Sequence, residues 1–169
     1  MKTLLVLRHA KSSWDDSTLD DHERPLNARG ERDAPRMGRL ARKKRFAVEL
    51  ILSSDALRAR LTAEAVADAI GYRGQILLDP RLYHASAAEI LTVLQSVVDD
   101  IVATVMIVGH NPGLEDLVTR LTGEPEGLPT AALAQIALPI DRWRDFTAST
   151  RGTLVGLWRP KELKDEGRP

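Results

Sequence analysis

Short apolar runs alternate along the chain with segments in which apolar residues recur at helical spacing. Continuous apolar runs such as residues 3–7 are typical of strands that are buried on both faces of a parallel sheet. By this pattern the chain has six strands, at residues 3–7, 49–53, 76–78, 104–108, 134–138 and 153–158. No helix fits between the last two runs, so at least one of them is expected to run antiparallel to a neighbour.

Four helices are predicted between these strands. Asn27 is placed to cap a first helix that runs to about Lys44, although Pro35 should remove a hydrogen bond there and bend or delay the helix. Ser86 and Glu89 have the spacing of a capping box before another helix. The remaining two helices are indicated by apolar residues on one face: Ala59, Ala63, Val66, Ala67 and Ile70 in one, and Leu114, Leu117, Val118 and Leu121 in the other.

This alternation predicts an α/β fold, a three-layer α/β/α sandwich around a mostly parallel central sheet. The length of 169 residues suits one domain, which we place at residues 1–160. Residues 161–169 form a polar C-terminal tail that is expected to fray. Hydrophobic residues make up 43% of the chain and charged residues 28%, which excludes wholesale disorder.

Charge and cysteine content exclude several classes of function. Lys plus Arg (24) balances Asp plus Glu (24), so neither a nucleic acid nor a membrane surface is expected as a partner, and any anion site must come from local clustering. The absence of cysteine excludes thiol catalysis, Cys-type metal sites and disulfides, and it fits a reducing cytoplasm, where we expect the protein to reside. No apolar stretch approaches the ~20 residues of a membrane span.

Candidate chemistry lies where predicted strands end. Ligands of open α/β sheets collect at the carboxyl ends of strands. Arg8 and His9 follow the first strand, and His110 follows the strand at residues 104–108. The two imidazoles would face one another if these strands are neighbours, although either histidine alone is equally well explained as a hydrogen-bonded structural residue. A metal site is disfavoured, because the chain has no HExxH pattern and no cluster of His and carboxylates.

Arg58 would lie in the first turn of a helix that begins beyond another strand end. The free N–H groups and the positive dipole of a helix N-terminus already favour an anion, and a guanidinium adds a fork that matches phosphate oxygens. Taken alone, Arg58 or Arg60 is better explained as an exposed helix arginine.

Three motifs together resemble a known family. Leu7-Arg8-His9-Ala10 is followed by Ser13-Trp14, then by Ser-Ser-x-x-x-Arg-Ala-x-x-Thr-Ala at residues 53–63 and by Val-Gly-His-Asn-Pro at residues 108–112. In this order they resemble the histidine phosphatase superfamily, a phosphoglycerate mutase-like group, and most closely its SixA-type phosphohistidine phosphatase branch. The matches extend from residue 4 to about residue 138.

The resemblance implies a metal-independent hydrolase without a cofactor. His9 would attack phosphorus and form a phosphohistidine intermediate, while Arg8, Arg58 and His110 would surround the phosphoryl oxygens. Asn111 would either contact the phosphoryl group or cap the following helix. The implied partner is a phosphate-bearing substrate, with phosphohistidine on a protein as the leading class. The sequence does not indicate an oligomeric state.

The sequence departs from the family in two ways. Lys11 and Asp15 stand where related mutases often carry Glu and Asn, which argues against a mutase-type pocket. Many relatives place a proton-donating Glu after the third strand, where His84 is the only plausible donor here, and a surface residue before a helix explains His84 at least as well. A missing acid favours a P–N substrate over an alkyl phosphate, because an alkoxide must be protonated to leave.

Two alternatives to a phosphohistidine phosphatase stay open at this point. One is a phosphomonoesterase that acts on small sugar or nucleotide phosphates. The other is a catalytically weak phosphate-binding module with a regulatory role. Retention of all four pocket residues argues against the module, since a degenerate site would be expected to lose His9 first.

Overall fold

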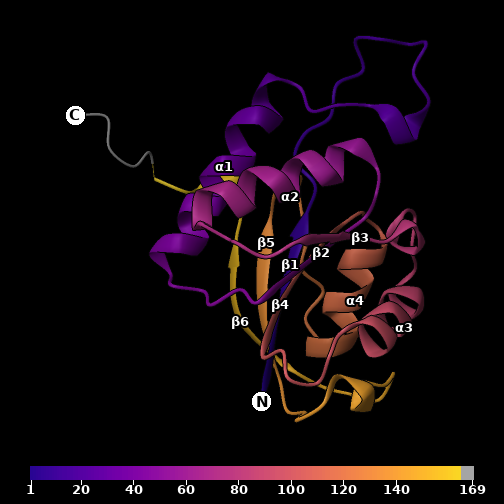
Figure 1. The fold of residues 1–169 in the computed structure, drawn as a ribbon, viewed down its shortest axis with the longest axis vertical. Coiled ribbons are helices and arrows are strands. Elements are labelled where there is room, and N and C mark those ends of the chain that lie inside the picture. Colours follow the sequence, from indigo (N-terminus) through magenta and orange to yellow (C-terminus); the bar gives the residue numbers. More distant parts are fainter. Residues whose placement is uncertain (165–169) are drawn as a thin grey trace.

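A six-stranded mixed sheet forms the middle layer of the computed structural model, which describes residues 1–164 (Figure 1). The strand order is β3-β2-β4-β1-β5-β6. Among these strands only β5 runs against the others, since β1 pairs in parallel with β4 and antiparallel with β5. The bounds are β1 (Lys2–Arg8), β2 (Leu50–Ser53), β3 (Ile76–Leu78), β4 (Thr104–Gly109), β5 (Leu133–Leu138) and β6 (Thr153–Trp158).

Strand β1 is central because it is apolar on both faces. Its side chains alternate between the two sides of the sheet. Leu4 and Val6 belong to one core cluster, Leu5 and Leu7 belong to the other, and all four are 0% exposed. The continuous apolar run at residues 3–7 therefore forms a strand that is covered on both faces of the sheet, as predicted.

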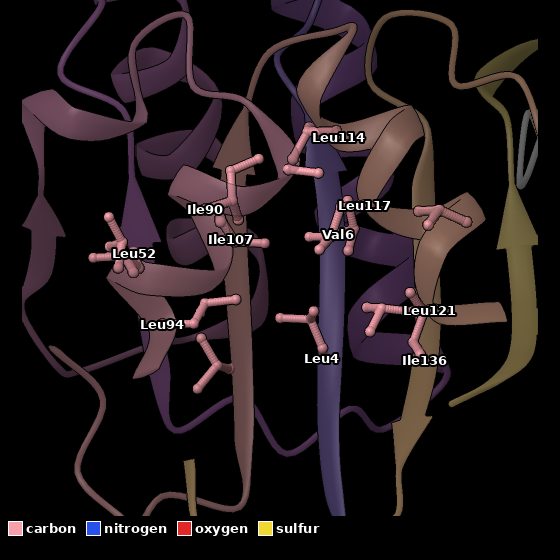
Figure 2. Packing of buried hydrophobic residues seen from close by; sticks show 14 of the residues in the cluster. Leu4, Val6, Leu52, Ile90, Leu94, Ile107, Leu114, Leu117, Leu121 and Ile136 are labelled. Atoms are coloured by element: carbon pink, nitrogen blue, oxygen red, sulfur yellow. The ribbon is translucent and has the colours of Figure 1, made fainter. Parts of the chain in front are cut away.

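Two helices cover each face of the sheet, which confirms the predicted three-layer fold. Helices α1 (Ala28–Lys43) and α2 (Leu57–Ile70) lie on one face, and α3 (Ala87–Val97) and α4 (Gly113–Thr122) lie on the other (Figure 1). Figure 2 shows Leu114 and Leu117 of α4 near Val6 of β1, and Ile90 of α3 near Ile107 of β4.

Helix α1 is not delayed by Pro35, contrary to expectation. It begins at Ala28, where the Asn27 side chain accepts a hydrogen bond from the Gly30 amide, and continues past Pro35 to Lys43. Pro35 has no N–H to donate to the helix. The packing of α1 against α2 outweighs this lost hydrogen bond, because the two helices lie very close together. A Cβ on Gly38 would come within 2.5 Å of the Ala69 Cβ.

The first residues of the segment predicted to fray are packed instead. Leu163 packs against the cluster beneath α1, and the Arg36 side chain donates a hydrogen bond to its carbonyl oxygen. A boundary after residue 160 is therefore too early for the packed structure. Residues 165–169 of the predicted tail lie outside the described residues.

Candidate active site

The carboxyl ends of β1 and β4 bring two histidines together. These strands are parallel neighbours in register, with Arg8 opposite Gly109. His9 and His110 are the next residues along each strand, and their ring centroids are 5.1 Å apart. The end of β2 lies on the other side of β4, so Arg58 in the first turn of α2 reaches the same edge.

A pocket of about 240 Å³ opens at this edge of the sheet. It is lined by the six residues proposed from the sequence as site residues, and by five others. The six are Arg8, His9, Arg58, His84, His110 and Asn111; the five are Lys11, Ser12, Trp14, Arg24 and Thr130.

His9 is a neutral ring with one nitrogen engaged. Its Nδ1 donates to the Ala10 carbonyl oxygen over 2.7 Å, which leaves the lone pair on Nε2. Burial, together with the nearby guanidinium charges, lowers the pKa of His9 to about 4. Thr62 fixes this loop to α2, because its hydroxyl accepts from the Ala10 amide and donates to the Arg58 carbonyl oxygen.

Ser54 sets the orientation of His110. The Ser54 hydroxyl oxygen accepts the Ala56 amide, so its own hydrogen can go to His110 Nε2, 2.8 Å away. When Ser54 donates, Nε2 of His110 is the acceptor and the ring proton is on Nδ1. Nδ1 is buried and has no hydrogen-bond partner among residues 1–164. Burial and the neighbouring His9 lower the pKa of His110 to about 3, so this ring is also neutral at pH 7.

Arg58 is 5% exposed and is held by Asp21. Its two terminal nitrogens donate to the Asp21 carbonyl oxygen at 2.7 Å and to the Asp21 carboxylate at 3.0 Å. Arg8 donates from Nη1 to the Leu128 carbonyl oxygen. In both arginines the Nε–H is buried without a partner in the described part of the chain.

Arg24 is a third guanidinium at the pocket, which the sequence did not reveal. It is 6% exposed, donates from Nη2 to the Ser12 hydroxyl and stacks 3.4 Å from the centroid of the Trp14 ring. Its Nε lies 3.5 Å from the Asp21 carboxylate in an ion pair, and neither Nε nor Nη1 makes a hydrogen bond within residues 1–164. Arg24 stands in a polar loop without periodicity, where no local pattern separates it from a surface arginine.

The buried polar atoms without a hydrogen-bond partner are concentrated at this pocket. In the described residues they are Nε of Arg8, Arg24 and Arg58, Nη1 of Arg24, Nδ1 of His110 and Oδ1 of Asn111. Each belongs to a pocket residue, and most are N–H donors. Folded proteins satisfy nearly all buried polar groups, so these N–H donors are available to an acceptor-rich ligand or to ordered water in the pocket.

Asn111 neither caps α4 nor offers a donor to a phosphoryl group. Its Nδ2 donates to Glu115 Oε1 and to the Leu128 carbonyl oxygen, both at 2.8 Å, so both of its hydrogens are used. The residue at the N-cap of α4 is Pro112. Both roles expected for the Asn111 side chain are therefore wrong, because its two N–H groups are bound to Glu115 and to the Leu128 carbonyl oxygen. The side chain instead stabilises the loop that carries Leu128.

His84 stands at the mouth of the pocket. Its side chain is 62% exposed, and its Nε2 lies 3.6 Å from the Asp21 carboxylate. The Tyr83 hydroxyl donates to the same carboxylate, which is the main reason that the pKa of Asp21 falls to about 2. No carboxylate of the described residues lines the pocket itself.

Two features are absent from the described residues. Within residues 1–164, no group of three or more His, Cys, Asp or Glu side chains is arranged to hold a metal ion. None of the helices in that part of the chain is both long enough and apolar enough to cross a membrane.

The buried imidazoles predict a loss of stability in mild acid. In the unfolded chain each ring is protonated below about pH 6.5, whereas in the folded protein the pKa of His9 is about 4 and that of His110 about 3. As the pH falls from 6.5 towards 4, the unfolded state therefore binds protons that the folded state does not. The free energy of unfolding should fall by roughly 1.4 kcal/mol per pH unit for each ring. Urea denaturation between pH 7 and 4.5 measures this slope.

Histidine variants separate this effect from general acid denaturation. A His9→Asn/His110→Asn double variant should have a much shallower slope over this range. His84→Gln, which removes an exposed ring, should keep the slope of the wild type. A wild-type free energy of unfolding that stays constant down to pH 4.5 would contradict a buried, neutral histidine pair.

Comparison with known proteins places this geometry in a family. The family model for the histidine phosphatase superfamily (branch 1) matches residues 4–90. An uncharacterized chloroplastic protein of Arabidopsis thaliana is 34% identical over 170 residues, which cover 94% of this chain and 78% of that protein. Phosphohistidine phosphatase SixA of Escherichia coli is 28% identical over 138 residues, which cover 80% of this chain and 84% of SixA.

A solved structure is similar over nearly the whole fold. The structure of the protein histidine phosphatase SixA complexed with tungstate superposes with a TM-score of 0.82 at 27% identity, covering 96% of this chain and 99% of that one. The family match, the relatives and the shared fold agree with the motifs read from the sequence. The chain therefore belongs to the histidine phosphatase superfamily (branch 1) and is similar to its SixA phosphohistidine phosphatases.

Proposed function

We propose that this chain is a metal-independent phosphatase that works through a phosphoryl group on His9, and that its substrates are phosphohistidines on proteins. The observation that carries the proposal is the set of unpartnered buried donors on Arg8, Arg24, Arg58 and His110 around the neutral His9. A phosphoryl group supplies the acceptors that these donors lack. The similarity to SixA, a protein named as a phosphohistidine phosphatase, supports the substrate class.

The first step transfers the phosphoryl group from one nitrogen to another. His9 Nε2 attacks phosphorus, and a new P–N bond forms while the bond to the substrate imidazole breaks. Charge develops on the phosphoryl oxygens, where the guanidiniums of Arg8, Arg24 and Arg58 and the Nδ1–H of His110 would stabilise it. A substrate ring that carries a proton on its remote nitrogen leaves as neutral imidazole. No added acid is needed.

Water completes the reaction by attacking phosphorus on phospho-His9. The P–O bond forms, the P–N bond breaks, and the His9 ring departs neutral because its Nδ1 hydrogen is still held by the Ala10 carbonyl oxygen. The proton lost by water goes to phosphate or to solvent. Leaving groups in both steps are therefore imidazoles, which suits a pocket that no carboxylate of the described residues lines.

Leaving-group dependence tests the substrate class. We expect phosphohistidine and an aryl phosphate to be hydrolysed with kcat/KM at least about 10²-fold higher than an alkyl phosphate, because general acid catalysis supplies about 10²–10⁴-fold and only an alkoxide depends on it. Phosphate release from the three substrates measures this order. A chelator should leave all three rates unchanged.

His84 is the proposed donor for the slow alkyl reaction. His84→Gln should lower only the rate on the alkyl phosphate, because neither phosphohistidine nor an activated aryl ester needs its proton. Equal rates on alkyl and aryl phosphates in the wild type would argue for a small-molecule phosphomonoesterase. Phosphate binding without turnover of any substrate would argue for a binding module. A cytoplasmic location stays a prediction.

A further inference from the structure

A second groove adjoins the catalytic pocket. It has a volume of about 470 Å³ and shares Arg8, Lys11 and Thr130 with the pocket. Its other walls come from the first half of α1, from Pro129 and from the segment that follows β6. A substrate whose phosphoryl group is held at His9 can therefore extend into the groove without crossing the outside of the fold.

The groove is strongly basic although the whole chain has a formal net charge of +0. Its lining contains six basic side chains and only two acidic ones, Asp33 and Glu162. The basic residues are Arg8, Lys11, Arg29, Arg36, Arg159 and Lys161. A local excess of this size attracts an anion even where the protein has no global field.

Several of these cations are already engaged, and others are not. Arg159 is paired with Glu126 and Glu162. The side chains of Lys11 and Lys161, in contrast, make no ion pair or hydrogen bond within residues 1–164. Arg29 is intermediate: its Nη2 donates to the Thr130 hydroxyl at 3.1 Å and its Nε is 3.8 Å from the Asp33 carboxylate, but its side chain is 46% exposed. Lys11, Arg29 and Lys161 thus form a set of cations that can bind an external carboxylate, which we call the open cations.

The catalytic pocket leaves most of a protein substrate outside it. A volume of about 240 Å³ holds a phosphoryl group and the ring that carries it, and little more. The Trp14 side chain at the same pocket is 70% exposed, as is typical of aromatic residues that contact a partner surface. Residues 15–23 beside it carry Asp15, Asp16, Asp20, Asp21 and Glu23. This acidic segment repels carboxylates and leaves the groove as the favourable path for them.

We propose that the groove binds an acidic segment of the phosphoprotein substrate, next to the phosphorylated side chain, and so selects phosphohistidines with Asp or Glu nearby. The inference rests on the proposed function, because it places the phosphoryl group at His9. The open cations contact the substrate's carboxylates, and the positive charge of the groove favours a substrate segment that extends from the catalytic pocket into the groove.

Two phosphohistidine peptides that differ only in flanking residues test the proposal. One carries Glu on both sides of the phosphohistidine, and the other carries Gln. At low ionic strength the wild type should hydrolyse the Glu peptide with kcat/KM about tenfold higher, as expected for two or three exposed charge pairs. The preference should fall below about twofold at 0.5 M salt, because salt screens exposed pairs.

Charge-reversal variants locate the effect. An Arg29→Glu/Lys161→Glu double variant should bring the Glu-to-Gln ratio of kcat/KM to about one or below. Arg73→Glu is the matched control, since Arg73 is exposed in the loop between α2 and β3, at the opposite edge of the sheet. It should keep the wild-type ratio. Equal rates on the two peptides in the wild type, or the same ratio in the groove variant and the control, would overturn the proposal.

A further measurement separates the groove from the chemistry. If neither phosphohistidine peptide is hydrolysed, the substrate class of the proposed function fails, and the groove is tested by inhibition of aryl phosphate hydrolysis. An unphosphorylated peptide of six Glu should then inhibit more strongly than a peptide of six Gln, and the groove variant should lose this difference. Equal inhibition overturns the proposal. So does a bisphosphorylated small molecule that is hydrolysed faster than both peptides, because the groove would then hold its second phosphate.

Discussion

His9→Asn is expected to lower the turnover of an aryl phosphate by roughly 10⁴-fold or more, because it removes the attacking lone pair on which both chemical steps depend. Asn keeps a polar group of similar reach at the end of β1. The guanidiniums of Arg8, Arg24 and Arg58 do not depend on the imidazole for their positions, since they are held by Leu128, Ser12 and Asp21. Inorganic phosphate should therefore still bind to the variant.

Two measurements make this expectation specific to a nucleophile. Wild-type protein that is quenched during turnover should carry an acid-labile, base-stable phosphoryl group that maps to His9, and the variant should carry none. Trp14 stacks on Arg24 in the pocket, so its fluorescence can report phosphate binding by the variant. A phosphoryl group on His110, or a variant that keeps more than about one per cent of the activity, would contradict the assigned role.

The fold was predictable because continuous apolar runs indicate buried strands, and apolar residues at helical spacing indicate the buried faces of helices. Residues 3–7 proved to be the core of β1, and the run at residues 153–158 matches β6. The expected juxtaposition of His9 and His110 followed from one physical rule, that parallel strands end at the same edge of a sheet. That β1 and β4 are neighbours, which the rule requires, came from the structure.

The parts that sequence reasoning missed depend on contacts between distant segments. Arg24 is buried only because the loop that carries it folds over Trp14 and Ser12. Asn111 has the residue type of a cap, but its amide is captured by Glu115 and by the Leu128 carbonyl oxygen, which lies 17 residues further along the chain. Local propensity describes what a side chain can do, whereas the competing partners decide what it does.

The missed residues also change how the site is understood. Without Arg24, the pocket has two guanidiniums and depends on His110 for further charge. With Arg24 it has three guanidiniums, all of which contribute to keeping the pKa of His9 low, and Arg58 also contributes to the low pKa of His110. The same charges that attract the phosphoryl group therefore help to keep the nucleophile unprotonated. A dianion bound among them would offset this effect, and the two rings would then hold protons more readily.

Arg58→Gln is expected to lower kcat/KM for an aryl phosphate by about 10²–10³-fold, the usual cost of removing one preorganised donor from developing negative charge. Gln retains a polar side chain but loses both the charge and the guanidinium fork. Because the Arg58 charge contributes to the low pKa of His9, the variant should also raise that pKa, and the acid limb of its kcat/KM profile should move to higher pH. Phosphate release measured from pH 4.5 to 8 gives both effects in one experiment.

Arg60→Gln is the matched control for Arg58→Gln, since it removes the same charge two residues along the same helix. Arg60 is exposed and lies 3.8 Å from the Glu64 carboxylate, away from the pocket lining. Its variant should retain wild-type kcat/KM within about twofold, because exposed ion pairs contribute little. If both variants lose activity equally, the effect is one of net charge and Arg58 does not contact the phosphoryl group. If only Arg58→Gln loses activity but its pH profile does not move, the guanidinium binds the substrate without controlling the protonation of His9.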